Sequence, residues 1–243
     1  MVKTVRFEEG AYLGDPINVI NLFNRFEVDE ITLLDVRATV AGRPPVFELI
    51  ERMAAECWVP LSYGGGIRST DDVRRVLTSG VEKIVLGTIA ADEPELITEA
   101  ARIFGAQAVI AAVDARRTGP GEYETFVASG TRPLHIDPAA YAREAASRGA
   151  GEILVTSIDR DGTMEGYDAE LIRLVADAVD VPVIACGGAG DRNHIAIPIE
   201  AGASAVAAGS IFVFQGRERG VLINFPDRAF LENLLSPPMP APR

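Results

Sequence analysis

Short apolar runs alternate with amphipathic stretches along the whole chain. The runs are three to six residues long and rich in β-branched side chains, whereas the stretches between them repeat apolar residues at helical spacing. Continuous apolar strands separated by helices are typical of βαβ units and a buried parallel sheet. The pattern predicts strands at residues 31–34, 59–62, 84–86, 108–113, 153–155, 181–185 and 205–208, and helices at residues 47–56, 70–78, 93–104, 138–147, 169–178 and 192–201.

A degenerate internal repeat relates residues 27–91 to residues 149–213, at an offset of 122 positions. The matching pairs are Val59-Pro60 with Val181-Pro182, Gly65-Gly66 with Gly187-Gly188, Gly80 with Gly202, and Gly87-Thr88 with Gly209-Ser210. A period this long duplicates half of a domain rather than a solenoid unit. Because a length of 243 residues is typical of one α/β barrel, the repeat predicts a (β/α)8 TIM barrel with half-barrel duplication.

The predicted barrel is a single domain over residues 1–235, and residues 236–243 (SPPMPAPR) are expected to form a disordered, proline-rich tail. Val2–Phe7 has the alternation of a hairpin arm, and the Gly- and Thr-rich segment Thr118–Pro133 is typical of a hairpin inside a βα loop. Seven barrel strands are predicted, whereas a closed barrel has eight. The first strand is therefore expected to be missing, either because the barrel is open there or because the sequence starts late.

Composition excludes several classes of function. The net charge of −12 disfavours binding to nucleic acids or anionic membranes. With no apolar signal region and no run of 18 apolar residues, the chain is expected to be cytoplasmic and free of membrane segments. Cys57 and Cys186 lie in apolar contexts and are expected to be free thiols. His135 and His194 are isolated, so we expect no metal, no cofactor and no Ser-His-Asp chemistry.

Glycine pairs end the strands at the face where the loops of a parallel barrel carry function. Gly64–Gly66 and Gly187-Gly188 each separate a strand from a helix, and Gly87-Thr88 and Gly209-Ser210 end the next strands with a hydroxyl. Glycine lets backbone amides approach an anion closely. One alternative is that the glycines only permit tight turns. Two copies with a hydroxyl at the same offset favour two phosphate cradles, and so a ligand with a phosphate at each end.

Carboxylates follow the same strand ends. Asp114 ends the apolar strand 108–113, and a carboxylate at the mouth of an apolar tube suits general acid–base catalysis, with a loop cap as the alternative. Asp161 and Gly162 lie in the loop IDRDGT and could add amides to the second phosphate site. Asp35 could equally be structural.

A second polar set begins the strands. Glu30, Lys83 and Glu152 each stand at a strand start, and Gln107 stands at another. Strand starts point to the floor of a parallel barrel, where position alone favours a stabilising charge network.

Four strings closely resemble one protein family. They are YGGGI at 63–67, FGAQAVIAAVDAR at 104–116, RGAGEILVTSIDRDGTMEGYD at 148–168 and IACGGAGD at 184–191. They resemble HisF, the cyclase subunit of imidazole glycerol phosphate synthase, and the resemblance runs to about Asn233. It implies a (β/α)8 barrel whose HisH-like glutaminase partner docks on the floor. Ammonia would then pass through the barrel to a ligand held by its two phosphates.

The resemblance implies roles for matching positions. Asp114 matches the catalytic acid of the fifth strand, and Lys3 matches a mobile-loop lysine that contacts substrate. Glu30, Lys83 and Glu152 match three of the four members of a charged ammonia gate, an implication that replaces the stabilising-network interpretation. The phosphate-binding positions are Gly66 and Thr88, with Gly87 in place of the usual asparagine, at one site, and Asp161, Gly162, Gly188, Gly209 and Ser210 at the other.

Two departures from the HisF pattern bear on activity. The second catalytic aspartate and the gate arginine of the family belong to the missing first strand, and loss of such an acid–base group costs roughly 10²–10⁴ in rate. Met1 stands where the resembling sequences have Val or Leu, so we expect the true start to lie upstream. The flanks VKTVRF, GDPINVINLFN, AAGSIFVFQG and VLINFP resemble the paralogue found with surface-polysaccharide gene sets.

These resemblances imply three functions. The favoured one is a barrel that accepts ammonia from the glutaminase and supplies a separate sugar amidotransferase, which converts an acetamido group to an acetamidino group. The second is a working cyclase of histidine biosynthesis with Asp114 as its acid. The third is a non-catalytic scaffold that activates the glutaminase and binds the transferase. A phosphoribosyl isomerase shares the repeat but lacks the IDRDGT and gate patterns, and it ranks last.

Overall fold

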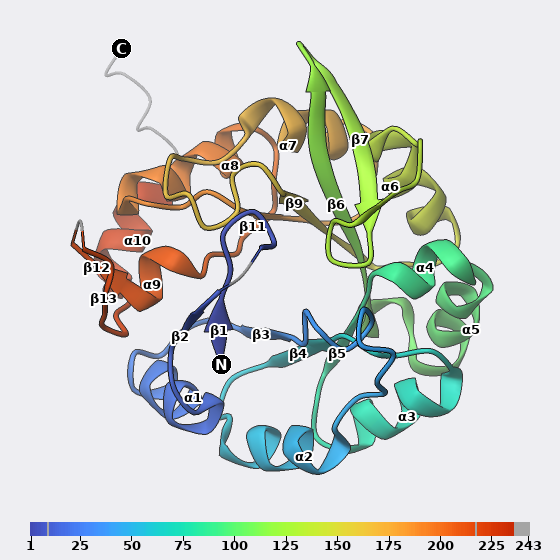
Figure 1. Ribbon diagram of the computed structural model, residues 1–243, viewed down its shortest axis with the longest axis horizontal. Helices are drawn as coiled ribbons and strands as arrows, with labels where there is room; N and C mark the ends of the chain where they lie inside the picture. The colour runs from blue at the N-terminus through green and yellow to red at the C-terminus, as the bar shows by residue number, and fades with distance from the viewer. Residues whose placement is uncertain (9, 217, 236–243) are drawn as a thin grey trace, which may run out of the picture.

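Seven parallel strands curl around a central axis in the computed structural model, which describes residues 1–8, 10–216 and 218–235, and helices cover their outer face (Figure 1). The side-chain-filled interior of this sheet is called the lumen below. In order around the sheet the strands are β3 (Ile31–Leu34), β4 (Leu61–Gly64), β5 (Lys83–Leu86), β6 (Val109–Gly119), β9 (Glu152–Ser157), β10 (Val183–Cys186) and β11 (Ala205–Val206). Neighbours pair in parallel, and within the described residues no pairing joins β11 to β3. The TIM-barrel-like fold is confirmed.

Two strands begin later than predicted, at β4 and β10. Val59-Pro60 and Val181-Pro182 lie in the preceding turns, because proline has no N–H to donate to a parallel ladder. Their carbonyls still continue the sheet, since Pro60 O accepts from Ile31 N and Pro182 O accepts from Ile153 N, each at 2.9 Å. The correction therefore falls at equivalent points of the two duplicated halves.

Three helices have the predicted bounds: α2 (Phe47–Glu56), α3 (Thr70–Thr78) and α6 (Pro138–Ser147). Close to prediction are α5 (Glu95–Phe104), α7 (Ala169–Ala176) and a 3-10 turn followed by α8 (Arg192–Ile195 and Ala196–Glu200). The pattern missed α1 (Pro16–Arg25), α4 (Thr88–Asp92), α9 (Ser210–Val213), α10 (Arg228–Leu235) and the 3-10 turn Ala106–Ala108. No helix within the described ranges is both long and apolar enough to span a bilayer.

The repeat is also present in the packing of the helices. Gly80 follows α3 with φ 96°, and Gly202 follows α8 with φ 98°, which fits the left-handed position after a helix end. A Cβ added at Gly80 would lie 3.2 Å from Ala54 Cβ, and one at Gly202 would lie 3.2 Å from Ala176 Cβ. Because Ala54 and Ala176 also differ by 122 positions, the half-barrel duplication is retained in tertiary contacts.

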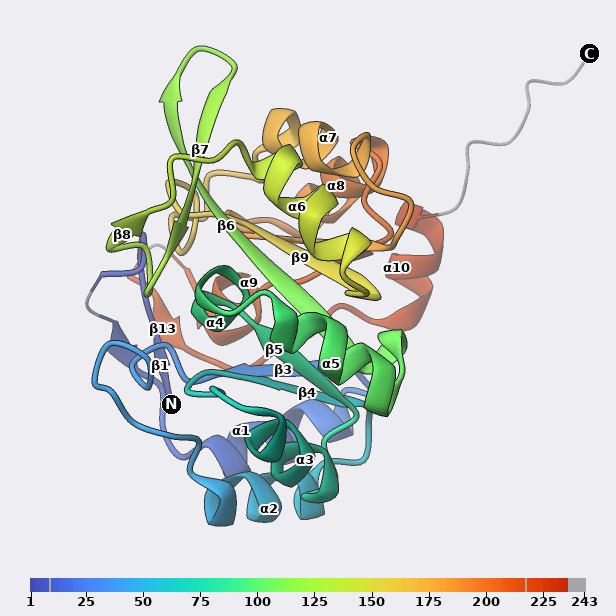
Figure 2. The same cartoon turned by 90° about the vertical axis from the view of Figure 1, so that its right-hand side faces the viewer.

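Two predicted hairpins lie at the end of the barrel where the strands finish. β1 (Val2–Lys3) pairs antiparallel with β2 (Ala11–Tyr12), which confirms the N-terminal arm. β6 continues beyond the barrel and pairs with β7 (Glu122–Val127), which in turn pairs with β8 (Arg132–Pro133). Figure 2 shows this second hairpin projecting from the molecule. A short antiparallel pair, β12 (Phe214–Gln215) with β13 (Gly220–Val221), completes the described strands. The predicted tail, residues 236–243, lies outside the residues that the structure describes.

Strand side chains divide into an outer and an inner set. The outward set packs with the helices in one large apolar core. The inward set forms a separate, smaller cluster around Val85, Ile110 and Leu154, with Ala112, Ile184, Cys186 and Ala207 packed against it. Alternation along each strand assigns the two sets. The same alternation places Lys83 and Glu152 at the floor of the lumen and Asp114 at its mouth.

Candidate functional site

Asp114 lies on the inner face of β6, at the mouth of the lumen. Across the sheet it stands level with Thr156 on β9, and Thr156 stands level with Cys186 on β10. Burial raises the pKa of Asp114 to about 7; a hydrogen bond with Thr156 opposes this, and the negative charge of Asp161 adds to it. Burial also raises the pKa of the Cys186 thiol, to about 12. At neutral pH the mouth therefore holds one carboxyl group that is close to its titration point and a protonated thiol.

Asp161 anchors the N-terminal arm over this mouth. The Lys3 ammonium lies 2.8 Å and 3.0 Å from the two carboxylate oxygens of Asp161, and the Thr4 hydroxyl donates to the same carboxylate at 3.1 Å. Arg6 N donates to the carbonyl of Asp161 at 2.8 Å. Asp161 is only 7% exposed. The structure thus brings together two predicted site residues, Lys3 and Asp161, that are 158 positions apart.

The predicted second phosphate cradle lies under the same arm. A Cβ at Gly162 would come within 2.3 Å of Thr4 O, and one at Gly209 within 3.1 Å of Lys3 Cε. Ser210 begins α9 and is 4% exposed, yet its hydroxyl finds no hydrogen-bond partner among the described residues. A buried hydroxyl without a partner is unusual in a folded protein and fits a position that a ligand would complete.

Gly187 and Gly188 are also explained by backbone packing. A Cβ at Gly187 would lie 2.8 Å from Ser157 O, and one at Gly188 would lie 2.2 Å from Gly166 O. Both glycines have φ in the left-handed region, at 95° and 113°. The tight-turn interpretation therefore accounts for this pair without any ligand.

The predicted first cradle lies at the ends of β4 and β5. Gly66 packs against the loop after β3, where a Cβ would lie 2.7 Å from Arg43 O. A Cβ at Gly87, by contrast, would meet only Ala112 within 4 Å, at 4.0 Å. The Thr88 hydroxyl accepts from Ala128 N at 2.9 Å and retains its proton for a further acceptor. The loop after β7 thus covers this cradle, whereas the N-terminal arm covers the other.

Lys83 joins both glutamates at the floor. Its ammonium lies 3.0 Å from a Glu30 oxygen and 2.9 Å from a Glu152 oxygen, and the Ser62 hydroxyl donates to Glu30. Burial disfavours the charged ammonium, but the hydrogen bonds and charges of Glu152 and Glu30 outweigh it and raise the pKa of Lys83. Gln107 does not join this network, because its amide donates to the carbonyl of Phe104.

The remaining candidates have structural partners. The Asp35 carboxylate accepts from the N–H groups of Arg37 and Ala38, and so caps its own loop. Asp159, which precedes Asp161 in the IDRDGT loop, accepts from Arg117 N at 2.8 Å. No cluster of three potential metal ligands occurs within the part of the chain that the structure describes. Cys57 and Cys186 are free thiols, as expected.

Sequence reasoning missed two groups of residues at this face. Thr156 could have been found from the sequence, because the alternation of side chains along β9 directs it inward beside Asp114. The second group is a cluster in which the Tyr123 hydroxyl donates to Asp168 at 2.8 Å and Arg117 pairs with Asp168 and Glu170. It fastens the β6–β7 hairpin to the start of α7. No local sequence pattern predicts this contact, because its members are far apart in the chain.

Comparison with known proteins assigns the chain to a family. A profile described as histidine biosynthesis protein matches residues 1–218. The chain belongs to this family. It is 43% identical over 236 residues to a Leptospira interrogans protein provisionally named imidazole glycerol phosphate synthase subunit HisF, covering 96% of this chain and 93% of that protein.

Two further relatives carry similar provisional names. The chain is 44% identical over 228 residues to subunit hisF2 of Pseudomonas aeruginosa strain PAO1, covering 93% of this chain and 91% of that protein. It is 41% identical over 231 residues to subunit hisF3 of Vibrio vulnificus strain YJ016, with 93% and 88% covered. The resemblance to HisF is therefore confirmed over most of the chain, and the protein is a HisF-like member of the histidine biosynthesis protein family.

Proposed function

We propose that this HisF-like chain is the ammonia-accepting barrel subunit of a glutamine-dependent enzyme. Ammonia would enter at Glu30, Lys83 and Glu152, cross the lumen and leave beside Asp114. The observation that carries the proposal is the inward cluster around Val85, Ile110 and Leu154, which stands between a charged floor and a titratable mouth. None of the residues in this cluster carries a charge.

An apolar lumen discriminates between the two forms of ammonia. A cation pays a large desolvation cost in such a tube, whereas neutral ammonia has a cost closer to that of one polar group. The Lys83 ammonium at the entrance adds repulsion against ammonium ions. The floor therefore favours entry of neutral ammonia over ammonium. Such ammonia would come directly from a subunit that binds against the floor and excludes water, and a HisH-like glutaminase is such a subunit.

The mouth supports a phosphorylated ligand. The unpartnered Ser210 hydroxyl, the Lys3 ammonium and the open space beside Gly87 are the features that favour one. The proposed site residues are those with matching positions in HisF: Gly66, Gly87 and Thr88 on one side, and Asp161, Gly162, Gly188, Gly209 and Ser210 on the other. A bis-phosphate would span the two sides.

The proposed acceptor of the ammonia is a sugar bound by a separate amidotransferase. There the nitrogen of ammonia would replace the carbonyl oxygen of an acetamido group, which leaves as water, to give an acetamidino group. This assignment rests on the flanking strings that resemble the surface-polysaccharide paralogue. The test is reconstitution of the chain with the glutaminase and the transferase of the same cell, scoring acetamidino product per glutamate formed. Lys83→Met should lower that ratio severalfold without lowering the amount of glutamate. An unchanged ratio would contradict a channel through this floor.

A second candidate is cyclase activity, favoured by the Asp114 pKa near 7 and by the names of the relatives. In it, Asp114 would exchange a proton with the imidazole precursor. Purified chain, ammonium salt and the phosphoribulosyl aminoimidazole substrate test this directly. Turnover at a cyclase-like rate would establish the cyclase and overturn the sugar assignment. Glutaminase stimulation with no ammonia transfer would instead leave the scaffold function.

A further inference from the structure

The loop that joins β3 to α2, residues 35–46, exposes three valines. Val36 is 38% exposed, Val40 61% and Val46 45%. Because the loop follows the carboxyl end of β3, it lies at the mouth of the barrel, at the same end as β8 and the N-terminal arm (Figure 2). Its carbonyl at Arg43 packs against Gly66 of the first predicted cradle, where a Cβ would come within 2.7 Å. An apolar surface therefore borders the exit proposed for ammonia.

Hydrogen bonds hold this β3–α2 loop in one conformation. The Asp35 carboxylate caps its start, and Arg43 N donates to Ala38 O at 2.8 Å within it. The Ser129 hydroxyl, from the loop after β7, donates to Val36 O. Exposed side chains on a fixed backbone lose little conformational entropy when a partner covers them, which is a property of interface anchors.

A hollow of about 350 Å³ continues this surface between the start of α2 and α3. Val46 and Phe47 give it apolar walls, and Arg43, Arg75 and a single carboxylate, that of Glu48, add charge. The Arg75 guanidinium lies 3.6 Å from the centre of the Phe47 ring, which places a cation directly over an apolar wall. The hollow thus combines apolar surface with positive charge.

The charge of this surface differs from that of the protein as a whole. The chain carries −12, yet two guanidinium groups and one carboxylate line the hollow, and Arg37 adds a third guanidinium on the loop. Arg43 pairs with Asp35 at 3.4 Å, whereas Arg37 and Arg75 form no ion pair within the residues that the structure describes. A fitting partner would present an apolar side chain to the valines and carboxylates to these arginines.

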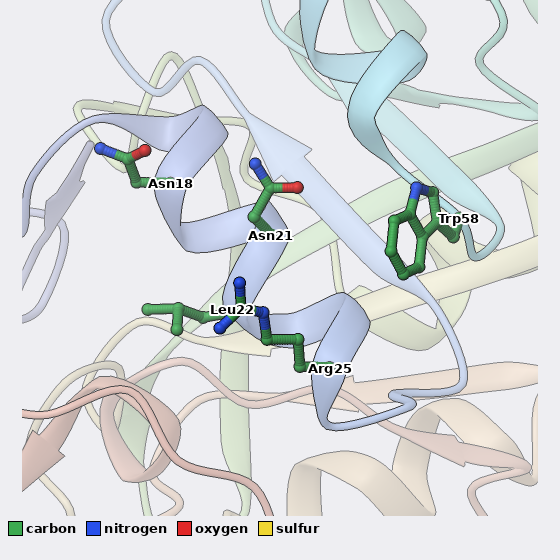
Figure 3. Close-up of a pocket in the computed structure, with 5 residues that line it drawn as sticks. All are labelled: Asn18, Asn21, Leu22, Arg25 and Trp58. Atoms are coloured by element: carbon green, nitrogen blue, oxygen red, sulfur yellow. The ribbon is translucent and has the colours of Figure 1, made fainter.

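A second hollow lies at the other end of the barrel. Trp58, the single tryptophan of the chain, borders it together with Leu22 and Arg25 of α1 (Figure 3). Val46 precedes the first residue of α2 and Trp58 follows the last by two positions, and ten helical residues span about 15 Å. The two hollows therefore belong to opposite ends, and the one at the floor provides matched controls for the one at the mouth.

We propose that the β3–α2 loop and its hollow are the docking surface for the enzyme that consumes the ammonia, a sugar amidotransferase with an acidic patch. This inference rests on the proposed function. Ammonia that left beside Asp114 into bulk water would be protonated to ammonium and lost as a nucleophile, so its consumer has to cover the mouth. Charge separates the possible occupants: a second copy of the chain would bring the same arginines to the contact, whereas an acidic partner would pair them.

Titration calorimetry of the chain with the purified amidotransferase of the same cell tests the surface. Val40→Asp and Arg37→Glu should each weaken the complex at least about tenfold, as loss of an interface anchor does. The matched controls are Trp58→Asp and Arg25→Glu, which make the same kinds of change at the floor hollow and should leave the affinity unchanged. Added salt should weaken the wild-type complex more than that of Arg37→Glu, because the lost contact is ionic.

The other outcomes separate this inference from the proposed function. If the loop variants and the wild type bind the amidotransferase equally, the docking surface is wrong and ammonia transfer stands. If the wild type does not bind it, the docking surface is wrong as well, and the reconstituted mixture decides on the function. Acetamidino product from glutamine would then keep the proposed function, and product from ammonium salt alone would overturn it. If the chain associates with itself and Val40→Asp abolishes that association, a second copy occupies the surface and the inference fails.

Discussion

Lys83 and Glu152 form an ion pair of 2.9 Å at the floor of the barrel, although 69 positions separate them in the chain. The same ammonium also pairs with Glu30, which precedes β3. One cation at the start of β5 thus holds the carboxylates at the starts of β3 and β9. Both partners are partly buried, which makes this network more sensitive to loss of its centre than an exposed pair would be.

Lys83→Met should therefore destabilise the fold. The substitution leaves Glu30 and Glu152 without their shared cation, and we expect a loss of about 1–3 kcal/mol at neutral pH. Urea unfolding checks this. The double variant Lys83→Met with Glu152→Gln should recover part of the loss, because one repelling charge is gone. If the free energy of unfolding of Lys83→Met equals that of the wild type within error, the ion pairs of Lys83 do not stabilise the fold.

Asp114→Asn should stabilise the protein at alkaline pH. Asp114 has an ordinary pKa of 3.8 unfolded and about 7 folded, so the native state holds an extra proton between these values. Stability contributed by the protonated acid is present below pH 4 and is lost as pH rises to about 7. The variant lacks that loss, so its advantage should grow from pH 4 to 7, reach roughly a few kcal/mol and then stay level.

Unfolding curves from pH 4 to 9 measure the difference. Asp177→Asn, at the exposed end of α7, serves as the control for loss of a surface carboxylate. If the wild type and Asp114→Asn run parallel across this range, Asp114 is not the titrating group.

Lys3→Ala should release the N-terminal arm. The Lys3–Asp161 pair and the Thr4 hydrogen bond hold residues 2–6 on the barrel mouth, and both depend on one carboxylate. We expect hydrogen exchange in this segment to quicken at least about fivefold, since arms of this kind unfold locally. Lys3→Arg keeps the charge and should retain most of the protection.

The same variant should raise the pKa of Asp114 further, because the charge of Asp161 would no longer be balanced by an adjacent ammonium. ¹³C NMR of labelled aspartate resolves that titration. If Asp114 has the same pKa in Lys3→Ala as in the wild type, the Lys3–Asp161 pair does not influence the titration of Asp114.

Ser210→Ala should leave stability nearly unchanged while weakening phosphate binding. Its hydroxyl makes no hydrogen bond to any residue that the structure describes, so its removal breaks none among them. Calorimetry with inorganic phosphate should show about a tenfold loss of affinity if the hydroxyl donates to the anion. Ser79→Ala, after α3, serves as a control for the loss of a surface hydroxyl. Equal phosphate affinity in Ser210→Ala and wild type would remove Ser210 from the binding site.

Strand and helix positions were largely predictable, because apolar runs and helical spacing are local properties of the chain. α2 and α6 have the predicted bounds, whereas α1 was missed even though Asp15 and Pro16 give it a clear start. Asn18, Asn21 and Asn24 dilute its apolar stripe. The short helices α4 and α9 are each no longer than five residues, too short for any periodic signal.

The candidate site was predictable in its members but not in their partners. Strand alternation places Asp114, Lys83 and Glu152 in the lumen, because inward and outward side chains obey a local rule. The pairing of Lys3 with Asp161, and that of Ala128 with Thr88, depends on how long loops fold back over the mouth. No local rule encodes such a return, so these contacts required the structure.

Different segments cover the two predicted phosphate cradles, and this makes the two sides of the barrel mouth unequal. At the floor turns the duplicated halves are equivalent, since Gly80 meets Ala54 as Gly202 meets Ala176. At the mouth the equivalence ends, because a neutral backbone N–H from Ala128 closes one side and a cation from Lys3 closes the other. A two-ended ligand would therefore meet different groups at its two ends: the backbone N–H bonded to Thr88 at one, and the Lys3–Asp161 ion pair at the other. The polarity of the barrel thus comes from the segments added around the repeat and not from the repeat itself.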